Sequence, residues 1–281
     1  MDRLIKTMAF DDKVRILAVD TTELVNKALF IHKASPVVTA ALGRLLTAGT
    51  MMGAMMKGDK EKLTLMMKGD GPIEGLVVCA NNKAEVKGYA YNKDVDLPLN
   101  SKGKLDVGGA IGHTGMLTII KDIGLKEPYS GSVPFVSGEI AEEFAKYFME
   151  SEQTPSVVAL GVLVSNTGEV LHAGGYILQL MPNVPDEIIT LIEGRVNNIK
   201  PITTLLKEEF TLEEIVKAVS GDEELKIVEE IMPKYECDCT KERMEKAVAS
   251  ITTEERQAII DDMGYIEVKC NFCNNAYRFD G

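Results

Sequence analysis

Residues 237–239 read Cys-Asp-Cys and residues 270–273 read Cys-Asn-Phe-Cys, so four cysteines form two close pairs late in the chain. The 30 residues 240–269 separate the two pairs. Four thiolates brought together from two such arms complete the tetrahedral shell that zinc prefers, whereas two pairs that stay apart form only local disulfides. The fold of this part of the chain therefore depends on the state of its sulfur atoms.

Residues 233–281 are predicted to be a small zinc-binding domain. The sequence predicts a helix over residues 241–249, a second helix that begins after Thr253 and ends at Gly264, and a strand over residues 265–269. A unit of fewer than about 50 residues rarely builds an adequate hydrophobic core and usually needs a cross-link, such as disulfides or a bound metal ion. The cysteines can bind such a metal ion, and loss of the metal is expected to unfold the domain.

Residues 181–232 are predicted to be an all-helical linker. Pro182 and Pro185 end the preceding strand, and apolar residues then recur at helical spacing from residue 186 to residue 232. Residues 211–214, Thr-Leu-Glu-Glu, form a capping box. Acidic residues dominate this segment, so its short helices are expected to be marginally stable unless they pack against another part of the protein.

Residues 1–180 mix helix and strand signals, which predicts an α+β domain. Ser35-Pro36 begins a long, mostly buried helix that runs to residue 56, and a second helix capped by Ser137 extends through residue 148. Alternating and apolar runs bounded by turn residues predict two hairpins, which join residues 75–80 to 86–91 and residues 157–164 to 169–180.

The composition is that of a soluble globular protein: the chain has 281 residues, of which 45% are hydrophobic, and no apolar run is long enough to cross a membrane. The polar residues 1–6 lack the apolar stretch of a signal peptide, so a cytoplasmic location is expected. Five cysteines in a reducing compartment are expected to be thiols or metal ligands rather than permanent disulfides. A net charge of −12 argues against nucleic acid as a general partner.

The spacing of the cysteines leaves several kinds of chemistry open. A permanent structural zinc site is the simplest, and an iron–sulfur cluster has suitable ligands. A thioredoxin-like centre is disfavoured because a strand rather than a helix follows Cys273. A redox switch is the further alternative: a Cys237–Cys239 disulfide closes a very small ring and is strained, Cys270 and Cys273 pair more easily, and formation of both would release zinc.

Other candidate sites reduce to structure. Cys79 lies in an apolar run and is expected to be a buried, inert thiol. Residues 69–75 have glycines at the wrong spacing for a dinucleotide fingerprint and are expected to form a turn, and no phosphate-binding loop of the ATPase type is present. The histidines His32, His113 and His172 are scattered away from the cysteine pairs, and each is expected to be an ordinary histidine. The methionine stripe Met51, Met52, Met55 and Met56 is expected to serve core packing.

With these features in place, the chain resembles the heat shock protein 33 family of redox-regulated bacterial chaperones. The resemblance extends over the full length. It rests on Gly69-Asp70-Gly71-Pro72, Gln153-Thr154-Pro155-Ser156, Gly174-Gly175-Tyr176, the helical linker, and Cys-x-Cys followed by Cys-x-x-Cys.

The resemblance implies an ATP-independent holdase that is inactive when reduced and zinc-bound. Cys237, Cys239, Cys270 and Cys273 would bind the zinc ion, and oxidants would convert them to the disulfides Cys237–Cys239 and Cys270–Cys273. Zinc release would unfold the C-terminal domain, loosen the linker and expose apolar surface to unfolding client proteins. The resemblance also implies an active homodimer and transfer of clients to ATP-dependent refolding chaperones. One departure is Asp238, which stands where the family often has a basic residue.

Two rival functions place the zinc site in a purely structural role. The first is a cytosolic enzyme with its active site in residues 1–180, but no nucleophile, base and orienting residue cluster there in the sequence. The second is a nucleic-acid-binding protein, whose support is limited to a few lysines near the cysteines, namely Lys234, Lys241, Lys246 and Lys269.

Overall fold

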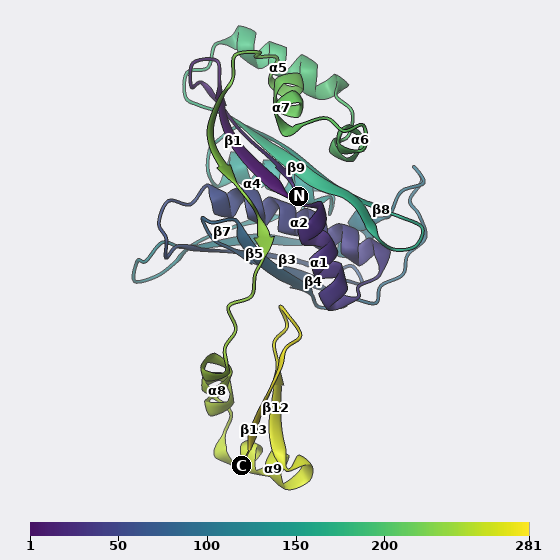
Figure 1. Ribbon diagram of the computed structural model, residues 1–281, viewed down its shortest axis with the longest axis vertical. Coiled ribbons are helices and arrows are strands. Elements are labelled where there is room, and N and C mark those ends of the chain that lie inside the picture. Colours follow the sequence, from purple (N-terminus) through teal and green to yellow (C-terminus); the bar gives the residue numbers. More distant parts are fainter. Residues whose placement is uncertain (281) are drawn as a thin grey trace. The chain divides into compact units, whose positions relative to one another are not determined.

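The computed structural model describes residues 1–280 and divides the chain into two compact units. The first unit is Met1–Tyr235 and the second begins at Glu236. Figure 1 shows the helices and strands of each unit. The first unit contains a five-stranded and a six-stranded sheet with their helices, and the second contains all four of the paired cysteines.

One buried helix, α2 (Pro36–Ala54), forms the centre of the first unit, with a sheet on either side (Figure 1). Seventeen of its 19 residues are buried, which confirms the predicted core helix. Glycines let the neighbouring elements approach closely: a Cβ on Gly43 would lie 2.7 Å from Val25 Cγ1, and one on Gly49 would lie 2.7 Å from Val78 Cγ1. By length and composition α2 is apolar enough to cross a membrane, but 94% of that stretch lies buried.

The five-stranded sheet covers one side of α2 and is antiparallel throughout. Its strands, in spatial order, are β10 (Lys226–Ile231), β1 (Arg3–Ala9), β2 (Val14–Asp20), β9 (Val170–Leu180) and β8 (Ser156–Val164). The hairpin of β8 and β9 confirms the second predicted hairpin. Three helices cover the face turned away from α2 (Figure 1), namely α5 (Asp186–Asn198), α6 (Ile202–Lys207) and α7 (Leu212–Ser220).

The six-stranded sheet covers the other side of α2. Its strands are β11 (Lys234–Tyr235), β5 (Glu85–Ala90), β4 (Gly75–Ala80), β3 (Lys62–Gly69), β6 (Gly115–Asp122) and β7 (Tyr129–Pro134). Only β11 and β5 run parallel. The β4–β5 hairpin and the turn at residues 70–74 were both expected. Three further helices complete the unit, namely α1 (Thr22–His32), α3 (Val107–Ile111) and α4 (Ile140–Glu150).

The prediction that residues 181–232 are helical throughout is wrong for residues 226–231. These residues form β10, which pairs antiparallel with β1. The segment contains β-branched Ile227, Val228 and Ile231, and the edge of β1 supplies hydrogen-bond partners that the local sequence does not reveal. The preceding helices do pack: α5, α6 and α7 bury apolar side chains in a second hydrophobic cluster against the five-stranded sheet.

The predicted cap at Ser137 is wrong: the N-cap residue of α4 is Glu139, which makes no side-chain cap hydrogen bond, and Glu143 instead holds the segment that precedes the helix. Helix α4 begins at Ile140, and the Glu143 side chain in its first turn is fully buried. Its Oε atoms accept hydrogen bonds from the backbone N–H groups of Val136, Ser137 and Gly138, at N to O distances of 2.7, 2.9 and 2.8 Å. A buried carboxylate that accepts three N–H donors fixes the chain segment leading into the helix.

Replacing Glu143 by Ala should lower the free energy of unfolding of the first unit by about 3–5 kcal/mol, because three backbone donors lose their acceptor in a buried site. Urea denaturation followed by circular dichroism measures this change. Glu150→Ala, an exposed change in the same helix, is the matched control and should shift stability by less than about 0.5 kcal/mol. Equal effects of the two changes would contradict the assigned role.

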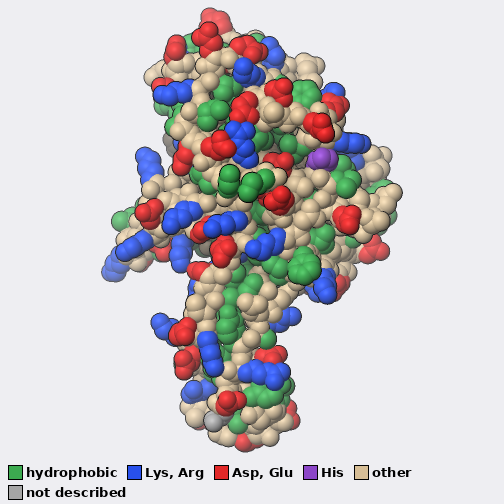
Figure 2. All heavy atoms as spheres, in the orientation of Figure 1, with side chains coloured by type: hydrophobic (Ala, Val, Ile, Leu, Met, Phe, Trp, Pro, Cys, Tyr) green, Lys and Arg blue, Asp and Glu red, His purple; other side chains and the backbone are tan. Residues whose placement is uncertain are grey.

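Arg3 on β1 connects the linker segment to the sheet. Figure 2 shows acidic and basic side chains interspersed over the face that it draws. Arg3 forms two ion pairs with acidic residues of the linker. Its Nη2 lies 2.6 Å from Glu213 Oε1 on α7, and its Nε lies 2.7 Å from Glu230 Oε1 on β10. The hydrogen bonds from Arg3 hold the pKa of both carboxyl groups below the ordinary value of 4.5.

These lowered pKa values predict a pH-dependent effect of Arg3→Met. A carboxyl group with a depressed pKa in the folded state stabilises that state above its ordinary pKa, and the contribution disappears as the pH falls through the depressed value. Arg3→Met should therefore weaken the hydrogen-exchange protection of α7 and β10 at pH 7. The difference from the parent protein should shrink below about pH 4. A difference that is independent of pH would contradict this assignment.

Candidate metal centre

The second unit consists of two helices and one hairpin. Helices α8 (Lys241–Ala249) and α9 (Thr253–Met263) precede the antiparallel strands β12 (Tyr265–Lys269) and β13 (Ala276–Asp280). Helix α8 and strand β12 have the predicted bounds, and α9 begins one residue earlier than predicted, at Thr253. Thr252 and Glu255 form a capping box at the start of α9, and Gly264 ends the helix in the left-handed conformation.

This unit has almost no hydrophobic core. In the described residues 236–280, only Val248, Ile266 and Cys270 are buried, and α9 buries none of its residues. Two apolar side chains and one thiol remove far too little apolar surface from water to offset the conformational entropy lost on ordering the unit. The unit therefore needs a further constraint, and its cysteines are placed to supply one.

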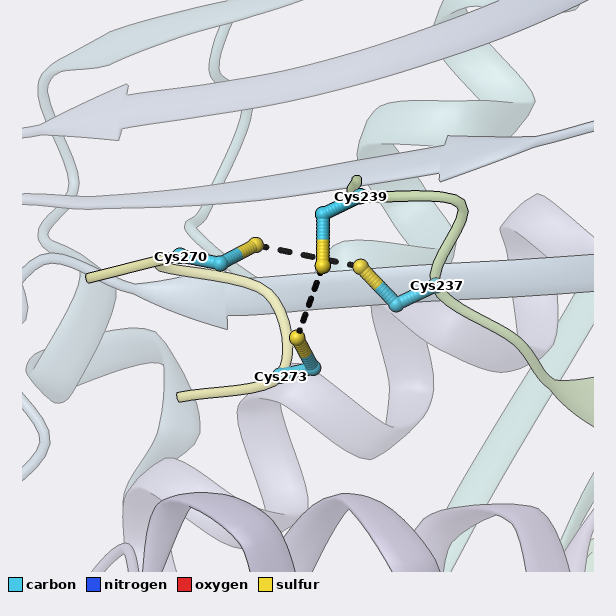
Figure 3. Close-up of side chains that lie close together, drawn as sticks. All are labelled: Cys237, Cys239, Cys270 and Cys273. Atoms are coloured by element: carbon cyan, nitrogen blue, oxygen red, sulfur yellow. Dashed lines mark hydrogen bonds between the residues drawn. The ribbon is translucent and has the colours of Figure 1, made fainter. Parts of the chain in front are cut away.

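The four cysteines converge from two segments of the chain, as Figure 3 shows. Cys237 and Cys239 precede α8, whereas Cys270 and Cys273 lie in the turn between β12 and β13. The Asn274 N–H donates to the Cys270 carbonyl at 2.8 Å, and a positive φ of 62° at Asn274 allows the tight turn. All four sulfur atoms lie within 4.8 Å of one another. We call these four residues the cysteine cluster.

The short distances in the cysteine cluster run between the two arms. Cys239 Sγ lies 3.3 Å from Cys273 Sγ, and Cys237 Sγ lies 3.8 Å from Cys270 Sγ (Figure 3). Four sulfurs bound at about 2.3 Å in a tetrahedron lie about 3.8 Å from one another. A disulfide requires about 2.05 Å, and all of these cysteines are free. The donor set and spacing thus fit a metal ion held by four sulfur ligands.

The thiols of the cysteine cluster differ in acidity. Burial raises the pKa of Cys237 far above its ordinary value, and burial also raises the pKa of Cys273 to about 11. Burial acts in the same direction on Cys239, but hydrogen bonds from Tyr277 and from the neighbouring thiols outweigh it and leave the pKa of Cys239 below its ordinary value. Cys239 is therefore more readily deprotonated than Cys237 or Cys273.

Sequence reasoning missed Tyr277, the aromatic neighbour of this site. Its hydroxyl lies 3.2 Å from Cys239 Sγ and also donates to the Cys239 carbonyl at 3.2 Å. The hydrogen bond with Cys239 raises the pKa of Tyr277 to about 12, so the phenol remains a donor at neutral pH. Residues 276–279 were expected to be strand-like, but only the fold shows that Tyr277 reaches back across the hairpin to the first arm.

The remaining sequence candidates lie in the first unit and bear no relation to metal binding. Cys79 on β4 is half-buried rather than buried, and its Sγ lies 3.6 Å from Thr64 Oγ1. Met51 and Met52 are core residues, as expected of the methionine stripe. His32 is buried, and its Nε2 lies 3.0 Å from the Tyr235 hydroxyl, a structural contact.

Comparison with known proteins places this fold and cluster in a family. A family model described as Hsp33 protein matches residues 2–280. A protein of Clostridium beijerinckii named 33 kDa chaperonin is 50% identical over 278 residues, which cover 99% of this chain and 95% of that protein. A protein of Caldanaerobacter subterraneus with the same name is 49% identical over 276 residues, which cover 98% of this chain and 94% of that protein.

A solved structure agrees with these matches. The crystal structure of a 33 kDa chaperonin (heat shock protein 33 homolog) from Thermotoga maritima matches with a TM-score of 0.92 and 36% identity. The match covers 99% of this chain and 94% of that chain. The names of these relatives describe a chaperone and not an enzyme. The predicted resemblance is confirmed, and the chain belongs to the heat shock protein 33 family, described as Hsp33 protein.

Proposed function

We propose that this chaperone is a redox-regulated, ATP-independent holdase. It is inactive while the cysteine cluster holds one zinc ion, and it becomes active when oxidants convert the cluster to two disulfides. The observation that carries the proposal is the convergence of four free thiols, with 3.3 and 3.8 Å contacts between the arms, in a unit whose described residues 236–280 bury only three side chains.

Zinc is the metal that best suits the cysteine cluster. Four thiolates in a tetrahedron leave no open position for a substrate, so the site is structural rather than catalytic. A bound zinc ion would supply folding free energy on the order of 10 kcal/mol to a small domain. Cys237, Cys239, Cys270 and Cys273 would each contribute one sulfur ligand, and Tyr277 would orient Cys239 through its hydroxyl.

Oxidation would dismantle the link between the two arms. The proposed disulfides, Cys237–Cys239 and Cys270–Cys273, each form as two thiolates lose two electrons to hypochlorite or peroxide, which is reduced to chloride or water. Both bonds lie within one arm, so neither joins residues 237–239 to residues 270–273. The oxidised unit thus loses the zinc ion that joined its two arms. It is then expected to unfold, because its small hydrophobic core cannot hold the helices and the hairpin together.

The linker supplies the second step of the proposed switch. Helix α5 buries only Ile192 among its 13 residues, so its packing on the five-stranded sheet is weak. Departure of α5, α6 and α7 would uncover the apolar side chains of the second hydrophobic cluster, including Ile5, Ile16 and Leu178. Such a surface binds unfolded client proteins without nucleotide hydrolysis.

The proposal includes further expectations from family membership. The active form would be a homodimer in the cytoplasm, and bound clients would pass to ATP-dependent refolding chaperones. A net charge of −12 disfavours nucleic acid as a general partner of this form.

Removal of zinc from the reduced protein should unfold residues 236–280 and leave the sheets of the first unit intact. The reason is that the second unit depends on its ligands, whereas the first has its own core. Limited proteolysis after chelation, with cleavage sites assigned by mass spectrometry, measures this. Cys79→Ser should retain zinc and resist cleavage as the parent protein does. Resistance of residues 236–280 after complete zinc loss would contradict the prediction.

Oxidation should switch on client binding. Treating the zinc-loaded protein with hypochlorite, or with peroxide under mild warming, should release zinc and suppress the thermal aggregation of a client protein. Zinc release is read with a colorimetric chelator and aggregation by light scattering. Cys79→Ser should respond like the parent, because Cys79 lies outside the cysteine cluster. If zinc leaves and the client aggregates as before, the chaperone switch is refuted.

A further inference from the structure

Strand β8 forms one edge of the five-stranded sheet, and helix α4 packs against it without pairing as a strand. It is the outermost strand of that sheet in the described chain, as Figure 1 shows. Its nine residues, Ser-Val-Val-Ala-Leu-Gly-Val-Leu-Val, include no charged residue and no proline. Natural sheet edges normally carry such residues because an open edge pairs readily with other strands. An edge of this length without them is suited to accepting another strand.

The register of the hairpin shows which backbone groups are available. Pro155 O accepts from Leu180 N at 3.1 Å, and the pairing continues in register through Val157 and Leu178. Because hydrogen-bonded pairs alternate along an antiparallel ladder, the N–H and C=O groups of Val158, Leu160 and Val162 point away from β9. No other strand pairs with this side of β8 in residues 1–280.

A groove of about 630 Å³ runs along this edge. Residues 159–166 form one wall, and Leu99 and Leu105 contribute apolar side chains to it. Residues 201–203, at the start of α6, form a further part. They stand directly on β8, since a Cβ added to Gly161 would lie 2.7 Å from Ile202 Cγ2. The linker therefore narrows the groove in the folded resting form.

The charge of the groove is one-sided. Arg44 and Lys104 line it, and its described lining includes no aspartate or glutamate. Arg44 Nη1 pairs with Glu139 at 2.6 Å, but Arg44 Nε is buried without a hydrogen-bond partner in the described chain. A groove lined by two cations, one of which has a buried N–H group without an acceptor, suits a ligand that carries a carboxylate.

We propose that this groove binds an extended apolar peptide segment that carries a carboxylate, added as a strand to β8. Backbone groups of the segment would pair with Val158, Leu160 and Val162, and its carboxylate would meet Arg44 and Lys104. Unfolded clients supply such segments, so the inference rests on the proposed holdase function. A second copy of this chain fits less well, because its β8 is uncharged and brings no carboxylate.

Binding of a synthetic peptide to the oxidised full-length protein tests this inference. The probe is a fluorescein-labelled heptapeptide of alternating valine and threonine that ends in glutamate, and fluorescence anisotropy measures its affinity. N-methylation of three successive central residues should weaken binding by about tenfold or more, because the added strand loses its donors. Replacing the terminal glutamate by glutamine amide should weaken binding about fivefold.

Variants of the protein test the same two contacts. Leu160→Pro removes an outward N–H at an edge position where proline is tolerated, and it should weaken binding about tenfold. Lys104→Glu should weaken binding at least fivefold. Lys102→Glu, an exposed change in the same loop but outside the groove, is the matched control and should leave the affinity unchanged. Circular dichroism checks that each variant is folded, and the N-methylated probe tests the edge without any change to the protein.

Three results would overturn the inference. The first is equal affinity for the parent and N-methylated probes, and the second is equal weakening by Lys104→Glu and Lys102→Glu. The third is dissociation of an oxidised dimer by Leu160→Pro but not by excess peptide, which would make a second copy the occupant. Aggregation suppression measured on the same oxidised sample separates the two proposals. Suppression without edge-specific binding refutes only the groove, whereas absence of suppression refutes the holdase function itself.

Discussion

The scarcity of buried side chains in residues 236–280 is the constraint on which the rest of the account depends. Val248, Ile266 and Cys270 are the buried members of a unit with two helices and a hairpin. Because hydrophobic burial cannot hold these elements together, the fold of the unit is tied to the bonding state of four sulfur atoms. In the proposed function, a change in the chemistry of these sulfur atoms is therefore also a change in the fold of the unit.

The first unit provides the contrast that makes a local switch feasible. Helix α2 lies buried between two sheets, in a hydrophobic core that includes none of the four clustered cysteines. The covalent route from the cysteines to the linker passes through Tyr235, whose hydroxyl donates to the Gly88 carbonyl at 2.9 Å and contacts His32. Release of the linker from the five-stranded sheet therefore requires one of two events. Either the hydrogen bonds of Tyr235 break, or the weakly packed α5 separates from the sheet while Tyr235 stays bound. The same linker also bounds the groove along β8.

Local signals in the sequence predicted much of this architecture. Thr253 and Gly264 bound α9, the small and apolar residues after Pro36 predicted α2, and the paired cysteines predicted their own convergence. What escaped prediction depends on partners distant in the chain. Residues 226–231 have apolar residues that fit helical spacing, but β1 recruits them as a strand. Tyr277 has no local signal for its role, because the fold brings it to Cys239 across 38 positions of the sequence.

Hydrogen exchange during a stepwise hypochlorite titration of the zinc-loaded, full-length protein tests the central claim most directly. The account predicts that amides of α8, α9 and the β12–β13 hairpin lose protection in proportion to the zinc released, while α2 retains its protection throughout. Protection of residues 241–280 that persists after all zinc has left would show that the cysteine cluster does not hold this unit together. That result would contradict the first step of the proposed switch, in which loss of zinc unfolds the second unit.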